Sequence, residues 1–125
     1  MDLAAERRNG DFVRAQILGQ AVAACHDVAD GGLLVAVAEM ALAGDAGVTL
    51  TAEYGAKEWF GEDQARYVLA VRDAPAVLAA AAQKIPAILI GVSVNQNKLT
   101  LPGAVAISLP QLREAHERFF PAWFA

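Results

Sequence analysis

The sequence predicts an α+β fold in which helices pack on a mixed β-sheet. Segments with apolar residues at helical spacing alternate along the chain with short, β-branched, apolar runs. Glycine, proline and asparagine separate these segments and mark the turns. The 125 residues suffice for one domain with one core, so we expect residues 1–125 to form a single domain.

The first element is expected to be a helix. Its apolar residues at helical spacing begin at Phe12, and the carboxylate of Asp11 suits a first turn. Asn9 and Gly10 interrupt any longer helix, so the residues before Asp11 are expected to form a frayed lead. Gly19 is expected to end the helix.

Two apolar segments follow. Residues 21–25 are short and bounded by turns, which predicts a buried strand that contains Cys25 as a small apolar residue. Residues 33–42 are apolar almost all round and carry Glu39 as their only charge. This pattern predicts a helix that is buried on most sides and that Gly44 ends.

The rest of the chain continues the alternation of strands and helices. We expect strands at residues 48–51, 66–71, 85–92 and 105–109, a turn or short helix at 52–59, and helices at 75–83 and 110–120. Asp73 is placed to cap the first of these helices. Pro86 breaks the strand at 85–92, and the turn at 95–97 would return residues 98–101 as its hairpin partner.

Composition limits the classes of protein. Hydrophobic residues make up 56% of the chain and charged residues 19%, which predicts an apolar face for a partner. The net charge of −4 and the absence of a large basic cluster exclude nucleic-acid binding, and no apolar run reaches the roughly 18 residues of a membrane span. Cys25 is the only cysteine and the start lacks a signal peptide, so we expect a cytoplasmic protein.

A first polar cluster follows the strand at residues 21–25. It consists of His26, Asp27, Asp30, Gly31 and Gly32. These residue types suit a metal ligand, an acid/base pair or the electrostatics of a phosphate site. Alternatively, Asp27 or Asp30 caps the following helix. The spacing leaves both interpretations open.

A second polar cluster precedes the strand at residues 66–71. It consists of Gly61, Glu62, Asp63, Gln64 and Arg66. Two carboxylates and an arginine can hold a ligand or form a surface ion pair. Both clusters lie at strand ends, where ligands collect in layered folds.

The remaining polar and aromatic residues near the C-terminus indicate no further site. His116 is expected to be solvated, and Phe119, Phe120, Trp123 and Phe124 are expected to be core or docking contacts. The chain lacks a phosphate-binding GxxxxGK[ST] loop, a GxGxxG turn, a GxSxG elbow and a CxxC pair. We therefore expect no catalytic residue and no metal site in this chain.

Three segments resemble those of one enzyme family. CHDVADGGLLVAVAEMALAG, FGEDQARYVLAV and the closing LPQLREAHERFFPAWF are similar to segments of phosphoribosylformylglycinamidine synthase, in the same order. Together they span most of the chain from Gly10 onward, and two motifs with a matching end make the signal specific. The resemblance implies the C-terminal domain of a larger enzyme, of the type found in aminoimidazole ribonucleotide synthetase.

The resemblance also implies an activity. This family uses ATP and ammonia from glutamine to convert formylglycinamide ribonucleotide to the amidine in purine synthesis, with nucleotide, magnesium and the catalytic histidine mainly on preceding domains. The expected partners are therefore the ATP-binding domain, the pseudosymmetric second half of the enzyme and a glutaminase domain. A fragment without them is expected to be inactive.

The family's motif residues can be carried over position by position. The resemblance implies substrate or nucleotide contacts at His26, Asp27, Asp30, Gly31, Gly32, Gly61, Glu62, Gln64 and Arg66. Ala29 and Asp63 stand where the family often has serine. The missing hydroxyls weaken a phosphate-binding role, and the carboxylate of Asp63 would repel a phosphate.

Other functions stay open at this level. The domain could be a scaffold that binds no ligand and only completes the assembly of the two halves. It could instead belong to a related enzyme of the selenophosphate synthetase or thiamine monophosphate kinase type. An exposed docking face would also let the isolated chain form a homodimer.

Overall fold

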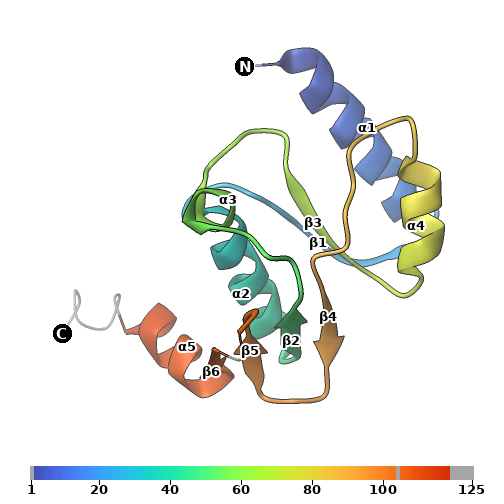
Figure 1. The fold of residues 1–125 in the computed structure, drawn as a ribbon. Coiled ribbons are helices and arrows are strands. Elements are labelled where there is room, and N and C mark those ends of the chain that lie inside the picture. The colour runs from blue at the N-terminus through green and yellow to red at the C-terminus, as the bar shows by residue number, and fades with distance from the viewer. Residues whose placement is uncertain (1, 104, 119–125) are drawn as a thin grey trace. The chain divides into compact units, whose positions relative to one another are not determined.

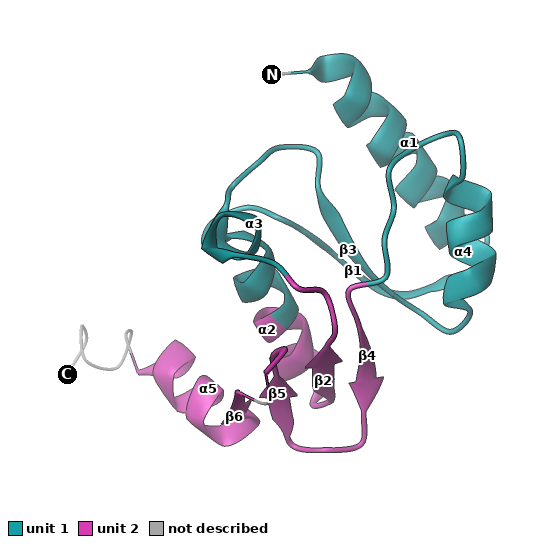
Figure 2. Cartoon of the chain, in the orientation of Figure 1, with its two compact units in different colours: residues 1–37, 54–89 teal, residues 38–53, 90–125 magenta. Residues whose placement is uncertain are grey.

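A computed structural model describes residues 2–103 and 105–118 of the chain (Figure 1). The chain divides into two compact units (Figure 2). The first comprises Met1–Val37 and Tyr54–Leu89, and the second comprises Ala38–Glu53 and Ile90–Ala125. Each unit is described separately below.

The first unit is built around an antiparallel pair of strands. Its elements are α1 (Leu3–Leu18), β1 (Val22–Asp27), the start of α2 (Gly32–Gly44), α3 (Ala56–Phe60), β3 (Tyr67–Val71) and α4 (Ala74–Ala81). Strands β1 and β3 pair with each other, and Asp27 lies opposite Tyr67. The end of β1 therefore lies beside the start of β3.

Helix α1 is longer than predicted. It runs without a break from Leu3, and the Asp2 side chain caps it by accepting the N–H of Ala5 at 3.0 Å. The expected frayed lead before Asp11 is therefore wrong. The side chain of Asn9 makes a tertiary hydrogen bond in the middle of the helix, which offsets its poor helix propensity. The helix ends at Gly19, as predicted.

The prediction that Cys25 is buried is also wrong. Cys25 is exposed, as are Ala23 and Ala24 before it. Strand β1 pairs only with β3 in a two-stranded sheet, and these small side chains bury little area against their surroundings. The buried apolar residues of this unit are Val13, Val28, Leu33, Ala36, Val37, Trp59 and Ala81.

The second unit holds a four-stranded mixed sheet. Its elements are the end of α2, β2 (Gly47–Leu50), β4 (Gly91–Val94), β5 (Lys98–Thr100), β6 (Ala106–Ser108) and α5 (Leu109–Glu117). The strand order is β4-β2-β5-β6, with β2 and β5 parallel and the other pairs antiparallel. Ala41 and Leu42 of α2 pack with Leu109 and Leu112 of α5 and with Val48 of β2. The expected α+β class, with helices on a mixed sheet, is confirmed.

The expected hairpin between β4 and β5 does not form. Strand β2 lies between them and pairs with both. Gly47 at the start of β2 makes this possible, because a Cβ there would overlap the carbonyl oxygen of Gln96 in the turn between β4 and β5. The turn closes over the start of β2 instead of joining two adjacent strands.

The predicted strand at residues 85–92 is shorter and begins later than expected. Only β4, which starts at Gly91, joins the sheet. Pro86 has no N–H to donate to a strand ladder, and it restricts Ile85 before it. Before β4, the carbonyl of Ile90 accepts the N–H of Thr51 at 2.8 Å.

The remaining elements agree with the predictions to within a few residues. Asp73 caps α4 by accepting the N–H of Ala76, and Ser108 caps α5. Residues 119–125 lie outside the described residues, and they include the predicted end of the last helix and the aromatic residues Phe119, Phe120, Trp123 and Phe124. None of the helices within residues 2–103 and 105–118 has the length and apolar character needed to cross a bilayer.

Candidate functional site

The two polar clusters meet within the first unit. The carboxylate Oε1 of Glu62 accepts a hydrogen bond from the backbone N–H of Gly31 at 2.9 Å. The antiparallel pairing of β1 and β3 causes this contact, because it places the turn after β1 beside the turn before β3. The predicted residues are therefore neighbours in space as well as members of two sequence motifs.

The double glycine after β1 allows the backbone at the end of α3 to pack closely against the start of α2. Gly31 and Gly32 adopt φ values of +86° and +81°, in the left-handed region. A Cβ on Gly32 would lie 2.5–2.8 Å from the carbonyl carbon, Cα and carbonyl oxygen of Phe60 at the end of α3. Only glycine fits both the φ angle and the contact. This packing accounts for the second glycine, which a simple helix cap would not need.

The start of α2 is not capped by the aspartates of the first cluster. Among the described residues, neither Asp27 nor Asp30 hydrogen-bonds to a backbone amide there, and the carboxylate bound at this point is that of Glu62. His26 is half-buried, and its Nδ1 lies beside the carbonyl oxygen of Asp27 and 3.6 Å from Oδ1 of that residue. The proposed cap by Asp27 or Asp30 is therefore wrong.

Arg66 of the second cluster binds backbone carbonyls. Its guanidinium donates hydrogen bonds to the carbonyl oxygens of Glu58 and Gly61, each at 3.4 Å. These carbonyls lie at the C-terminal end of α3, where unpaired carbonyl groups favour a cation. Within the described part of the chain Arg66 pairs with no carboxylate, so the alternative that these residues form a surface ion pair is wrong.

The turn between α3 and β3 has a further brace that the sequence patterns did not reveal. Ala65 adopts φ +64°, which is unusual for a residue with a side chain. Asn9 of α1 donates from Nδ2 to the carbonyl oxygen of Ala65 at 2.8 Å. The sequence pattern predicts only a break in the helix at Asn9 and Gly10. A polar residue and a glycine inside an otherwise helical segment were the available signal.

The exposed side chains of the two clusters are mostly negatively charged. Asp27, Asp30, Glu62 and Asp63 are exposed carboxylates, whereas the cationic group of Arg66 is engaged with carbonyls. Partial burial raises the pKa of the Cys25 thiol, and the charge of Asp27 raises that pKa further. No three His, Cys, Asp or Glu side chains among the described residues are grouped so that they could hold a metal ion. The geometry therefore offers hydrogen-bond acceptors and does not provide an activated nucleophile at Cys25.

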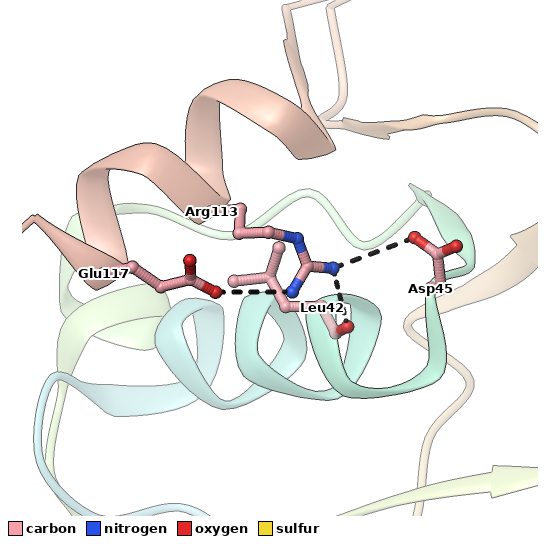
Figure 3. A network of polar contacts seen from close by, with 4 residues as sticks. All are labelled: Leu42, Asp45, Arg113 and Glu117. Carbon is pink, nitrogen blue, oxygen red and sulfur yellow. Dashed lines mark hydrogen bonds and ion pairs between the residues drawn. The ribbon is translucent and has the colours of Figure 1, made fainter.

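A separate polar network lies in the second unit (Figure 3). The guanidinium of Arg113 on α5 donates to the carbonyl oxygen of Leu42 at 3.1 Å and lies 3.8 Å from Asp45 and 3.6 Å from Glu117. An open hollow of about 420 Å³ lies beside this network. Of these contacts, only the Arg113 to Glu117 spacing of four residues could be recognised from sequence. Arg113 satisfies a carbonyl at the end of α2 and so ties α5 to that helix.

Comparison with known proteins identifies a family. The profile described as "AIR synthase related protein, C-terminal domain" matches residues 1–103. The chain is 60% identical over 130 residues to "Phosphoribosylformylglycinamidine synthase subunit PurL" of Acidiphilium cryptum (strain JF-5). This alignment covers 100% of the chain and 18% of that relative. It is 54% identical over 126 residues to the protein of the same name from Granulibacter bethesdensis, in an alignment that covers 100% of the chain and 17% of that relative.

Solved structures agree with the fold. A structure of "T. maritima PurL complexed with ATP" matches 84% of the chain and 21% of its own length, with a TM-score of 0.68 and 15% identity. A second structure, "T. maritima PurL complexed with FGAR", gives the same TM-score over 86% of the chain and 20% of its own length. The chain spans less than a fifth of the length of the curated relatives named above. Because the family profile covers most of its length, the chain belongs to the family described as "AIR synthase related protein, C-terminal domain".

Proposed function

We propose that this chain is the C-terminal domain of a phosphoribosylformylglycinamidine synthase. The full-length protein would be a cytoplasmic carbon–nitrogen ligase of purine biosynthesis that uses ATP, magnesium and ammonia from glutamine to convert formylglycinamide ribonucleotide to the amidine. The observation that carries the proposal is the 60% identity, over the entire chain, to a relative that bears this enzyme's name. The chain corresponds to 18% of that relative's length, which supports the proposal that it is one domain that acts together with others.

The joined polar clusters are the part of this domain that we propose faces the ligand. The contact between Glu62 and Gly31 holds the two turns together, so they present one edge. The proposed ligand-facing residues are His26, Asp27, Asp30, Gly31, Gly32, Gly61, Glu62, Gln64 and Arg66. Their placement at the adjoining ends of β1 and β3 supports this assignment.

A magnesium–triphosphate group does not fit this edge by itself. The four carboxylates would repel phosphate, and the guanidinium of Arg66 is bound to the carbonyls of α3. The N–H of Gly31 is also occupied by Glu62. We therefore assign the phosphates to other domains of the full-length protein. Carboxylates are acceptors, so the hydroxyl and amino groups of a ribonucleotide suit this edge better.

A scaffold function is the second candidate, and a specific observation favours it. The side chains of Arg66 and Glu62 form hydrogen bonds to backbone groups of the same unit. Large apolar side chains are also exposed in this unit. These include Phe60, Ile88 and Leu89. We propose that such residues dock onto the rest of the full-length protein, and that the isolated chain would self-associate through them.

Neutralising two carboxylates in the full-length protein separates these functions. Asp30 and Asp63 are exposed and bond to no described residue, so Asp30→Asn and Asp63→Asn should leave folding intact. If the edge faces the ligand, either variant changes the KM for formylglycinamide ribonucleotide or ATP several-fold. Glu53→Gln is the control, because it removes an exposed charge in the other unit.

The outcomes are distinct. Unchanged KM values for both variants would favour the scaffold function. Absence of ATP-dependent amidine formation by the unmodified full-length protein, supplied with ammonia, would overturn the proposed enzyme itself.

A further inference from the structure

We propose that Asn9 is a positioning residue for the turn at residues 61–66, although it lies 56 positions before the backbone carbonyl that it binds. This inference rests on the proposed function, because it concerns how the ligand-facing edge keeps its shape. Asn9 is expected to touch no ligand. It acts through Ala65, whose carbonyl oxygen it binds at 2.8 Å from a partly buried position.

The turn needs such a brace because Ala65 is in an unfavourable conformation. Its φ of +64° lies in the left-handed region, which a side chain disfavours. The two neighbours of Ala65, Gln64 and Arg66, are both residues of the proposed edge. A change in the Ala65 backbone would therefore move side chains on either side of it.

Other contacts hold the rest of the turn. Glu62 binds Gly31, and Arg66 binds the carbonyls of Glu58 and Gly61. After the turn, the carbonyl of Arg66 accepts the N–H of Val28, which continues the pairing of β1 with β3. The hydrogen bond from Asn9 is the contact that reaches Ala65 itself, and it comes from α1.

The sequence of α1 agrees with a tertiary role for Asn9. Asparagine and the following Gly10 are both poor helix formers, yet they lie in the middle of a continuous helix. A residue that served α1 alone would be better replaced by alanine. If the only role of Asn9 were local, Asn9→Ala should stabilise α1.

The test uses the full-length protein with Asn9→Ala and Asn9→Asp. The second variant keeps the shape of the side chain but cannot donate to a carbonyl. Arg8→Ala is the matched control, because Arg8 is an exposed neighbour on the same helix. Hydrogen exchange measured by mass spectrometry reports on α1 and on the amides of Val28 and Gly31, independently of activity. These two amides donate to the carbonyl of Arg66 and to the carboxylate of Glu62, so their exchange depends on the shape of the turn.

We expect exchange at the amides of Val28 and Gly31 to become about five-fold faster in both variants, as the loss of one hydrogen bond implies. Exchange in α1 should stay the same or slow in Asn9→Ala. The KM for formylglycinamide ribonucleotide should rise several-fold with a smaller change in kcat, and Arg8→Ala should change neither quantity.

Two results would overturn the inference. Unchanged exchange at Val28 and Gly31 would show that Asn9 does not hold the turn. Faster exchange with an unchanged KM would show that Asn9 holds a turn that has no part in ligand binding. Failure of the proposed function is distinguishable from both, because it would appear as an inactive unmodified protein.

Discussion

Gly32→Ala tests whether the approach of α3 to the start of α2 requires glycine. The substitution places a Cβ at φ +81° and 2.5–2.8 Å from three backbone atoms of Phe60. The left-handed backbone alone costs roughly 1 kcal/mol for alanine. Because backbone atoms cannot rotate away as a side chain can, the overlap adds about 1–3 kcal/mol. We expect a total loss of about 2–4 kcal/mol in the free energy of unfolding.

Gly103→Ala isolates the contribution of the φ angle. Gly103 has a φ of +86°, and a Cβ there would meet no atom within 4 Å. It should therefore cost only about 1 kcal/mol. Urea denaturation of the two variants, followed by far-UV circular dichroism, measures the difference. Equal losses for the two variants would refute the argument that contact with Phe60, beyond the φ angle, demands glycine at position 32.

Two further predictions concern single side chains. The pH dependence of Cys25 alkylation by iodoacetamide should show a thiol pKa above that of a free cysteine. Asp27→Asn should lower this pKa, because the thiolate would no longer face a carboxylate. A pH profile that is unchanged by the substitution would contradict this prediction. The raised pKa also means that Cys25 should stabilise the fold below the ordinary thiol pKa, and that this contribution is lost as the pH rises through the raised value. In the second unit, Arg113→Ala should cost about 1 kcal/mol of unfolding free energy through the lost bond to the Leu42 carbonyl, whereas Asp45→Asn should cost less than about 0.5 kcal/mol, since Asp45 is 82% exposed. Urea denaturation compares the two variants, and equal losses would rule out this division.

Residue patterns alone determined most of the secondary structure and the family. A continuous apolar run predicted α2, an alanine-rich segment predicted α4 and helical spacing predicted α5, and Asp73 and Gly19 marked helix ends as the structure has them. These features depend on residues within a few positions of each other, so they can be recognised without tertiary information. The motifs that resemble phosphoribosylformylglycinamidine synthase are also continuous stretches of sequence.

Tertiary structure decided which residues meet. The contacts of Glu62 with Gly31 and of Asn9 with Ala65 join residues far apart in the chain. The local pattern around Asn9 marks a residue that is unusual in a helix, but it does not indicate that the amide of Asn9 binds the turn before β3. The position of β2 between β4 and β5 has the same origin, because strand order depends on which edges are available when the chain packs. Periodicity gives the buried face of an element, whereas partners, exposure and the shape of a polar edge follow only from contacts between distant segments.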